Sequence, residues 1–292
     1  MDMTSDIARL RRFNRAVTRQ LGVLDTSFLK RGRPLGAARV LNAIGQGQNE
    51  VAAIRDYLDL DSGLMSRLLR GLEAEGLIET RPDSEDRRRR YVQLTAKGRK
   101  EFSVYESLSN DQAKALLALH PDRSKLLSAV DLITAALNTH QTEIIEADPS
   151  DDAAKRCLVA YYAELAERFA QGFDVNLSRD PDRADMLRPR GVFLMAIADG
   201  QPLGCVGLKG DGGTTAEIKR LWVDQNARNL GLARKLMNRA EDAGRALGIS
   251  VLRLDTNSAL PEAAAFYRKE GWVEIDRFND DPYPDMFFEK RL

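Results

Sequence analysis

The chain has 292 residues, about twice the length of an average domain, which predicts two domains. It carries 44 basic and 44 acidic residues, so a surface that attracts nucleic acid everywhere is excluded, and any such site must be a local patch. Hydrophobic residues make up 43% of the chain, which is typical of folded globular proteins and excludes a disordered one.

Cysteine and histidine usage limits the possible compartments and metal sites. Cys157 and Cys205 are far apart in sequence and lie in apolar surroundings, so no disulfide framework is indicated and a cytoplasmic location is expected. His120 and His140 are the only histidines, which argues against a histidine-based metal site, and we expect no bound metal. No apolar run reaches the roughly 18 residues of a membrane helix. The N-terminal stretch MDMTSDIARLRRFNRAV has no signal-peptide core.

The first half of the chain has the apolar spacing of helices. Apolar residues recur every three or four positions from Ile7 to Leu21, which predicts an amphipathic helix. A second helix is expected to begin at Pro34 and to end near Gly45. The remaining elements expected here are helices over 49–58, 62–75, 95–120 and 122–143, and short strands over 77–80 and 90–94.

Two short helices, a tight turn and a β-hairpin predict a mainly α winged helix-turn-helix domain. The second helix of the pair, 62–75, would enter the major groove of double-stranded DNA. Small residues at its start allow close approach, and arginines there can contact guanine edges or phosphates. The positions expected to face DNA are Ser62, Gly63, Ser66, Arg67 and Arg70.

The loop of the hairpin contains four consecutive arginines, Arg87, Arg88, Arg89 and Arg90. A charge run in a loop is usually only solvated. At the tip of a wing, however, such a run suits backbone phosphates or the minor groove, so we count these residues as DNA-binding candidates.

The stretch LDLDSGLMSRLLRGLEAEGLIETRPDSEDRRRRYVQLTAKG resembles the MarR family of transcription regulators. Its SEDRR followed by LTAKG is similar to that family's wing signature, and the resemblance covers about residues 5–143. The resemblance implies that Asp86 and Arg88 shape the wing. It also implies a homodimer through the first and last helices that binds a near-palindromic operator.

The polar segment 147–154, ADPSDDAA, contains Pro149 and predicts a linker. We therefore expect a DNA-binding domain over 1–146, a linker over 147–152 and a second domain over 153–292. Strands and helices alternate after the linker, which predicts an α/β fold with a central mixed sheet. The expected helices are 153–170, 229–247 and 261–270, and the expected strands are 192–198, 203–209, 215–223, 250–255, 272–278 and 285–290.

The hexamer RNLGLA, residues 228–233, joins a strand-like run to a helix-like run. Backbone N–H groups and the positive end of a helix dipole make such a turn an anion site, suited to a pyrophosphate. Gly231 allows close approach of the backbone, and Arg228 and Arg234 add positive charge. The hexamer alone is a weak signal, because an ordinary helix start can look the same.

The spacing R-x-x-G-x-A and its context LWVDQNARNLGLARKLM resemble the acetyl-CoA loop of GNAT N-acetyltransferases. The resemblance covers roughly 153–292 and implies transfer of an acetyl group from acetyl-CoA to an amine. Ala233 and Asn229 stand where the family often has glycine, which bears on affinity more than on binding. The residues implied in cofactor binding are Leu221, Trp222, Val223, Arg228, Asn229, Leu230, Gly231, Leu232, Ala233, Arg234, Asn257 and Tyr267.

The same resemblance implies catalytic roles for two residues. Glu217 matches the general base of many GNAT enzymes, although a glutamate in a strand is more often only solvated. Tyr267 matches the usual acid for the leaving thiolate, although a tyrosine at a helix end is otherwise an ordinary anchor. Asn257 matches an asparagine that bonds the amide arm of the cofactor, and Trp222 is alternatively a core residue.

The acceptor site is expected near Arg168, Phe173 and Tyr283. Arg168 can bind a carboxylate through two hydrogen bonds, and a surface ion pair is equally consistent with the sequence. Phe173 and Tyr283 are alternatively local packing. Three functions stay open: acetylation of a small amine coupled to operator binding, sensing of acetyl-CoA without turnover, and acetylation of protein lysines.

Overall fold

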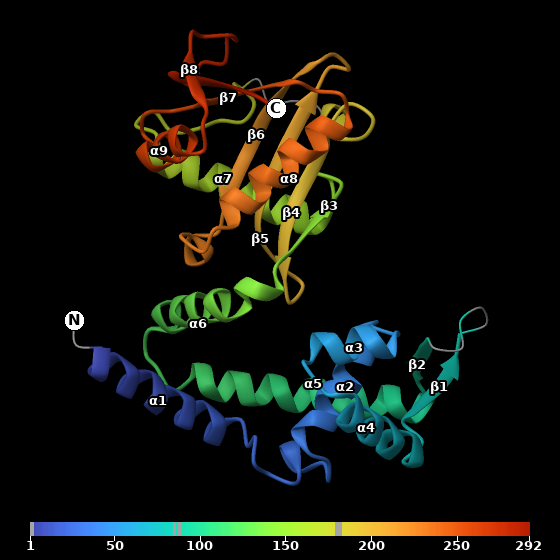
Figure 1. Cartoon of the computed structure of the whole chain (residues 1–292). Helices are drawn as coiled ribbons and strands as arrows, with labels where there is room; N and C mark the ends of the chain where they lie inside the picture. Colours follow the sequence, from blue (N-terminus) through green and yellow to red (C-terminus); the bar gives the residue numbers. More distant parts are fainter. Residues whose placement is uncertain (1–2, 84–85, 87–88, 179–182) are drawn as a thin grey trace. The chain divides into compact units, whose positions relative to one another are not determined.

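The computed structural model describes residues 3–83, 86, 89–178 and 183–292. The chain divides into two compact units, Met1–Arg123 and Ser124–Leu292 (Figure 1). In the part of the chain that is described, no helix is long and apolar enough to span a membrane.

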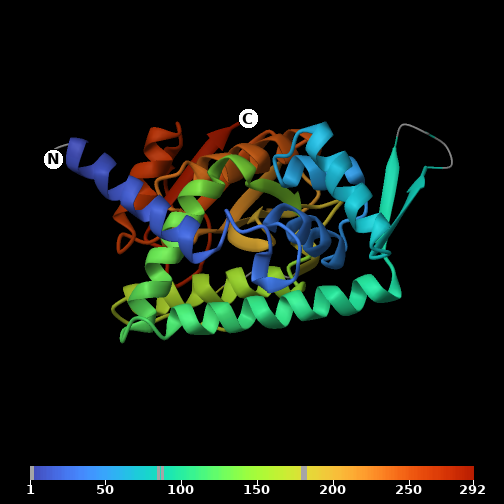
Figure 2. The same ribbon diagram turned by 90° about the horizontal axis from the view of Figure 1, so that it is seen from below.

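The first unit is mainly helical and contains one β-hairpin, the wing, before its last helix. Its hydrophobic core comes mainly from α2, α3 and α4 and includes Leu41, Ile54 and Leu69. The strands β1 and β2 pair as an antiparallel hairpin that extends beyond the helices of this unit (Figure 2). The elements are α1 (Met3–Gln20), η1 (Phe28–Lys30), α2 (Leu35–Gly45), α3 (Val51–Tyr57), α4 (Ser62–Ala74), β1 (Ile78–Pro82), β2 (Arg90–Leu94) and α5 (Ala96–Leu117).

The second unit is built on a mixed sheet of seven strands in the order β3-β4-β5-β6-β7-β9-β8, with β6 and β7 parallel. This confirms the α/β class. The helices are α6 (Arg123–Leu137), η2 (Asn138–Gln141), α7 (Asp152–Arg168), η3 (Arg183–Met186), η4 (Gln225–Ala227), α8 (Leu232–Ala246) and α9 (Pro261–Lys269). The strands are β3 (Glu143–Glu146), β4 (Val192–Ala198), β5 (Gln201–Gly210), β6 (Thr215–Val223), β7 (Val251–Thr256), β8 (Val273–Ile275) and β9 (Met286–Arg291).

The two faces of this sheet are both covered, as the nearly unbroken apolar run of β4 requires. Leu194 of β4 belongs to the core cluster with α8 residues such as Leu236. Its neighbour Phe193 belongs to the cluster with Cys157 of α7 and Cys205 of β5. Successive side chains therefore point to opposite faces, with α8 on one and α7 on the other (Figure 1). Both cysteines are free and buried.

The boundary between the units lies earlier in the chain than the sequence predicts. β3 precedes the expected linker, yet it pairs with β4, with Ile144 opposite Ala196. The compact units divide between Arg123 and Ser124, so α6 and β3 belong with the second unit. The strand β3 could not be predicted from the sequence, because four residues directly after a helical turn are too few to show the alternation of a strand.

The sheet opens where its two parallel strands end. Pairing of β6 with β7 stops at Ile218 and Leu254, although β6 continues to Val223. Just beyond, a bulge places Arg220 and Leu221 between the pairs Lys219–Gly207 and Trp222–Cys205. A bulge bends its strand and increases the local twist, and parallel strands in α/β sheets bind ligands beyond their carboxyl ends.

Candidate functional site

Two cavities lie at this opening. The larger has a volume of about 530 Å³ and runs from the end of β6 along the start of α8 to α9. The smaller, of about 110 Å³, lies between the ends of β6 and β7, α7 and the loop before β9. The two share a wall, so they meet at the residues that line both: Tyr161, Leu165, Leu221, Leu260, Ala263 and Tyr267.

The start of α8 forms the anion-binding part of the larger cavity. Gly231 is the N-cap residue with a φ of 82°, in the left-handed region, and no described side chain caps this end of the helix. The first four N–H groups of a helix have no partner within it, so they are available to an anion here. Asn229 also has a positive φ, of 63°, which turns the chain into the helix.

Most of the predicted cofactor residues line this cavity. Leu230 and Asn257 are the exceptions: Leu230 packs on the core, and Asn257 lines the smaller cavity. The predicted residues that line the larger cavity are Leu221, Trp222, Val223, Arg228, Asn229, Gly231, Leu232, Ala233, Arg234 and Tyr267.

Arg228 is held in place by α7. Its guanidinium pairs with Glu164 and donates from Nε to the Val223 carbonyl at 3.0 Å. Trp222 Nε1 donates to the same carboxylate of Glu164 at 3.0 Å. Arg234 pairs with Glu270 at the rim, and Lys269 also lines the cavity. The cavity therefore joins backbone donors to several cations, which fits a diphosphate group.

Tyr267 of α9 lies at the junction of the cavities and is 6% exposed. Burial, and then the negative charge of Asp255, raise the pKa of its phenol above the ordinary value. The hydroxyl therefore stays protonated at neutral and mildly alkaline pH.

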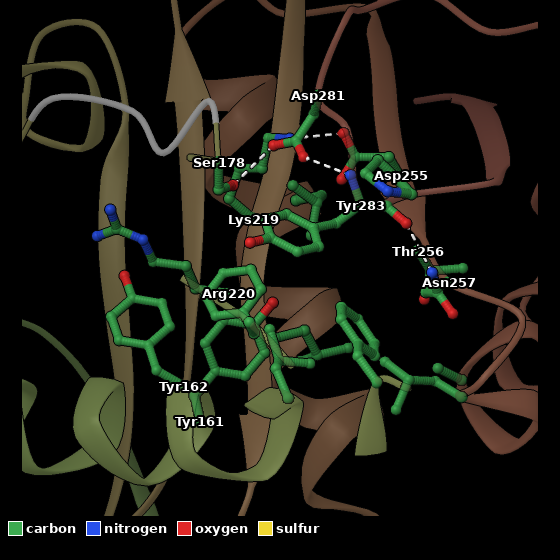
Figure 3. A pocket seen from close by; sticks show the side chains of 18 of the residues that line it. Tyr161, Tyr162, Ser178, Lys219, Arg220, Asp255, Thr256, Asn257, Asp281 and Tyr283 are labelled. Carbon is green, nitrogen blue, oxygen red and sulfur yellow. Dashed lines mark hydrogen bonds and ion pairs between the residues drawn. The ribbon is translucent and has the colours of Figure 1, made fainter. Parts of the chain in front are cut away.

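The polar side of the smaller cavity is organised around Asp255, the next-to-last residue of β7. Its Oδ2 accepts from Lys219 Nζ at 2.7 Å and from Asn279 Nδ2 at 2.6 Å. Asp281 also lines this cavity, and its carboxylate accepts from Ser178 Oγ at 2.7 Å (Figure 3).

Glu217 is not brought into either cavity. Its carboxylate lies 3.4 Å from Lys209 Nζ and 3.3 Å from Lys219 Nζ, and it is absent from both linings. Lys219 lies two residues further along β6, closer to the opening of the sheet. Its side chain, and not that of Glu217, therefore lines the smaller cavity. The structure therefore does not support the base role that the sequence resemblance gives to Glu217.

Aromatic side chains form the other wall of the smaller cavity. Phe173 and Tyr283, two of the predicted acceptor residues, line it with ring centroids 4.7 Å apart. Tyr162 stacks on Phe173 at 5.7 Å. Tyr161, Tyr162 and Phe169 also line this cavity, and they were not among the predicted acceptor residues.

Arg168 and Asn257 are already committed to partners. The guanidinium of Arg168 makes a two-bond pair with Glu262 and donates to the Ala259 carbonyl, and it lines the larger cavity. The ion-pair alternative therefore holds, and Arg168 does not form part of the acceptor cavity. Asn257 donates from Nδ2 to the Tyr283 carbonyl at 2.6 Å and accepts from Ala259 N–H at 2.8 Å, so it joins two loops of the cavity.

In the first unit, α4 presents one exposed face. Asp61 caps its start by accepting from Leu64 N–H at 2.8 Å. Met65, Leu69 and Leu72 are buried on the opposite side. All five residues predicted to face DNA are exposed: Ser62, Gly63, Ser66, Arg67 and Arg70.

The wing is described in part. Arg89 and Arg90 are exposed at the start of β2, and the backbone N–H of Asp83 donates to the Arg89 carbonyl at 3.0 Å. Arg87 and Arg88 lie outside the described residues, so their predicted DNA contacts stay predictions.

Comparisons with known proteins identify a related family for each of the two domains. Residues 158–272 match the acetyltransferase (GNAT) family, and residues 37–98 match a winged helix DNA-binding domain. An IAA acetyltransferase of Azospirillum brasilense is 36% identical over 117 residues, 38% of this chain and 74% of the relative. The chain belongs to the GNAT acetyltransferase family. Its N-terminal winged helix DNA-binding domain makes it a fusion, as predicted.

Two further GNAT relatives extend the comparison. An uncharacterised N-acetyltransferase of Schizosaccharomyces pombe is 29% identical over 133 residues, 42% of this chain and 82% of the relative. The solved structure of a PaiA N-acetyltransferase from Thermoplasma acidophilum, in complex with coenzyme A, shares 20% identity and a TM-score of 0.39, covering 52% of this chain and 99% of that one. As a GNAT acetyltransferase, the chain takes acetyl-CoA, whose thioester supplies the acetyl group when bound.

Proposed function

We propose that the second unit transfers an acetyl group to a small amine, with acetyl-CoA in the larger cavity and the amine in the smaller one. The observation that carries this proposal is the shared wall at Leu221 and Tyr267, where the two cavities meet. The volume of about 110 Å³ favours a small amine over the side chain of a protein lysine with its backbone. The cations and free N–H groups at the start of α8 hold the diphosphate.

Asp255 is the residue that we place as proton acceptor for the amine. Only one of its carboxylate oxygens, Oδ2, is bonded to Lys219 and Asn279 among the described residues, which leaves Oδ1 for an incoming ammonium. Its charge acts on Tyr267, so it lies close to the junction of the cavities. Geometry is the first requirement of a general base, and Asp255 meets it better than Glu217.

Tyr267 is the residue that we place as proton donor to the departing thiolate. Its burial keeps the phenol protonated, and it lines both cavities. A protonated hydroxyl at the junction can neutralise the charge that develops on sulfur.

Thiol release from acetyl-CoA tests this proposal across a panel of amino acids, polyamines and aminoglycosides, with acetyl-CoA binding measured on the same protein. We expect turnover that depends on one class of amine. Tight acetyl-CoA binding with no turnover for any amine would instead support a sensor of acetyl-CoA.

For the first unit we propose a homodimeric, MarR-like regulator that binds a near-palindromic operator. The support is the exposed face of α4 and the apolar stripe of α1, none of whose residues is buried. Replacing Arg67 with Ala should weaken binding of an operator fragment about tenfold or more, because one arginine contact to a base or phosphate is lost. Glu73→Ala, at the far end of α4, is the matched control, and equal losses in both variants would argue against this face.

A further inference from the structure

The larger cavity contains a carboxylate that the proposed acetyl transfer does not use, and the inference drawn from it rests on the proposed placement of acetyl-CoA there. This residue is Glu164 of α7, whose side chain is 24% exposed. A carboxylate in this lining repels a bound diphosphate unless cations balance its charge. The role of Glu164 therefore depends on the groups that it bonds.

Glu164 binds donors from three segments of the second unit. Its Oε2 accepts from Trp222 Nε1 at 3.0 Å and pairs with Arg228 Nη2. Its Oε1 lies 3.6 Å from Arg168 Nη1, one turn further along α7. The carboxylate thereby connects α7 with the end of β6 and with the loop that leads into α8.

The guanidinium of Arg228 is held in one orientation by two of its nitrogens. Its Nε donates to the Val223 carbonyl at 3.0 Å, and its Nη2 pairs with Glu164. Because the guanidinium is planar, these two bonds also fix the direction of the third nitrogen, Nη1. None of the described residues bonds Nη1, and the side chain of Arg228 lines the larger cavity with 36% of its surface exposed. Nη1 is therefore available to a phosphate oxygen of a ligand in this cavity.

Fixing an arginine before its ligand arrives favours binding. A free arginine side chain loses rotamer freedom when it binds a ligand, and a partner that already holds it lowers this cost. Glu262 lines the same cavity and carries the same charge, but its carboxylate makes a two-bond pair with Arg168. Of these two carboxylates, only Glu164 bonds Arg228.

We propose that Glu164 is a positioning residue for the cofactor. It holds Arg228 in the orientation that binds the diphosphate of acetyl-CoA, and this effect outweighs the repulsion between its own charge and the phosphates.

Calorimetry with acetyl-CoA tests this role, with thermal melting to establish that each variant is folded. We expect Glu164→Ala to weaken binding about tenfold, the size of one charge-assisted contact. Glu164→Gln keeps an oxygen acceptor of the same reach, so its loss should be smaller, about threefold. Glu262→Ala is the matched control: it removes the same charge from the same cavity without a bond to Arg228, and it should not weaken binding.

The Arg228→Ala background distinguishes positioning from a general effect on the fold. Once Arg228 is absent, Glu164→Ala should cause no further loss of affinity, because the residue that it positions is gone. A further tenfold loss in that background would overturn the inference. Wild-type or tighter binding in both Glu164 variants, or an equal loss in Glu262→Ala, would also overturn it.

Arg228→Ala alone separates this inference from the proposed function. Weaker binding in Arg228→Ala, with none in the Glu164 variants, overturns the positioning role and leaves acetyl-CoA in the larger cavity. Wild-type affinity in Arg228→Ala contradicts the placement of the diphosphate beside Arg228, and the inference then fails with it.

Discussion

Single residues at the junction of the cavities derive their roles from burial and from neighbouring charges. Burial lowers the pKa of Lys219, but the charges of Asp255 and Glu217 and their bonds outweigh it, and its pKa is raised overall. Lys219 therefore stays charged and fixes Asp255. Tyr267, in contrast, stays uncharged, because burial and the charge of Asp255 both raise the pKa of its phenol and favour the neutral form.

Replacing Tyr267 with Phe should lower kcat about 100-fold, the usual size of a general-acid contribution, with little change in acetyl-CoA affinity. The raised pKa keeps the phenol protonated as the pH rises, so wild-type kcat should not fall between pH 8 and pH 10 through this group. Thiol release across this range measures both effects. A wild-type descending limb with an apparent pKa below 10 that disappears in the Phe variant would contradict the raised pKa of Tyr267. A Phe variant with the kcat of the wild type would contradict its role as the acid.

Where a backbone motif defines the candidate residues, the sequence indicates which of them line the larger cavity. The cradle from Arg228 to Arg234 follows from one spacing, because backbone N–H groups need only a turn and a helix start. Side-chain chemistry is harder to predict, since Glu217 and Asp255 are both strand carboxylates bonded to Lys219. The two differ only in where they lie relative to the end of β6–β7 pairing and the bulge at Arg220. Asp255 lies beyond the last pair and lines the smaller cavity, whereas Glu217 lies within the paired stretch and lines neither cavity.

Among the elements, α8 has its start at the larger cavity and most of its length in the core. Its first turn faces the larger cavity, while Leu236, Met237 and Ala240 bury the rest of the helix against the sheet. The predicted helices and strands after 152 lie within a few residues of their expected places because most of them are long and strongly periodic. β3 is short, and the early boundary at Arg123 could not be predicted from local pattern.

A valine at Gly231 should cost stability and weaken acetyl-CoA binding about tenfold or more, because a β-branched residue resists a φ of 82° and distorts the N–H groups. Gly248 gives a matched control at the other end of the same helix, with a φ of 78° and no place in either cavity. Its valine variant should lose similar stability, by thermal melting, and keep acetyl-CoA affinity, by calorimetry. Equal loss of affinity in both variants would show that the turn at the start of α8 has no specific role in binding acetyl-CoA.

At the scale of the whole molecule, α1 carries an exposed apolar stripe. Ile7 is 52% exposed and Leu10 61%, and they repeat on one face of an amphipathic helix. An exposed apolar stripe of this kind usually marks an interface. The stripe gives physical support to the proposed homodimer.

The double variant Ile7→Glu, Leu10→Glu should therefore convert a dimer into monomers and lower affinity for a two-half-site operator, because paired half-sites require paired chains. Light scattering at matched concentrations measures the change. Arg12→Glu, on the opposite face of α1, should leave the dimer intact. A wild-type monomer, or an undisturbed dimer in the double variant, would remove α1 from the interface.

The proposed role of Asp255, rather than Glu217, as proton acceptor for the amine is tested by measuring the turnover of Asp255→Asn and Glu217→Gln side by side. Both carboxylates pair with Lys219, so the two variants remove the same charge from the same lysine. We predict that Asp255→Asn lowers kcat at least about 100-fold while acetyl-CoA binding persists, and that Glu217→Gln stays within about threefold of wild type. The reverse order, with Glu217→Gln inactive and Asp255→Asn active, would contradict the account.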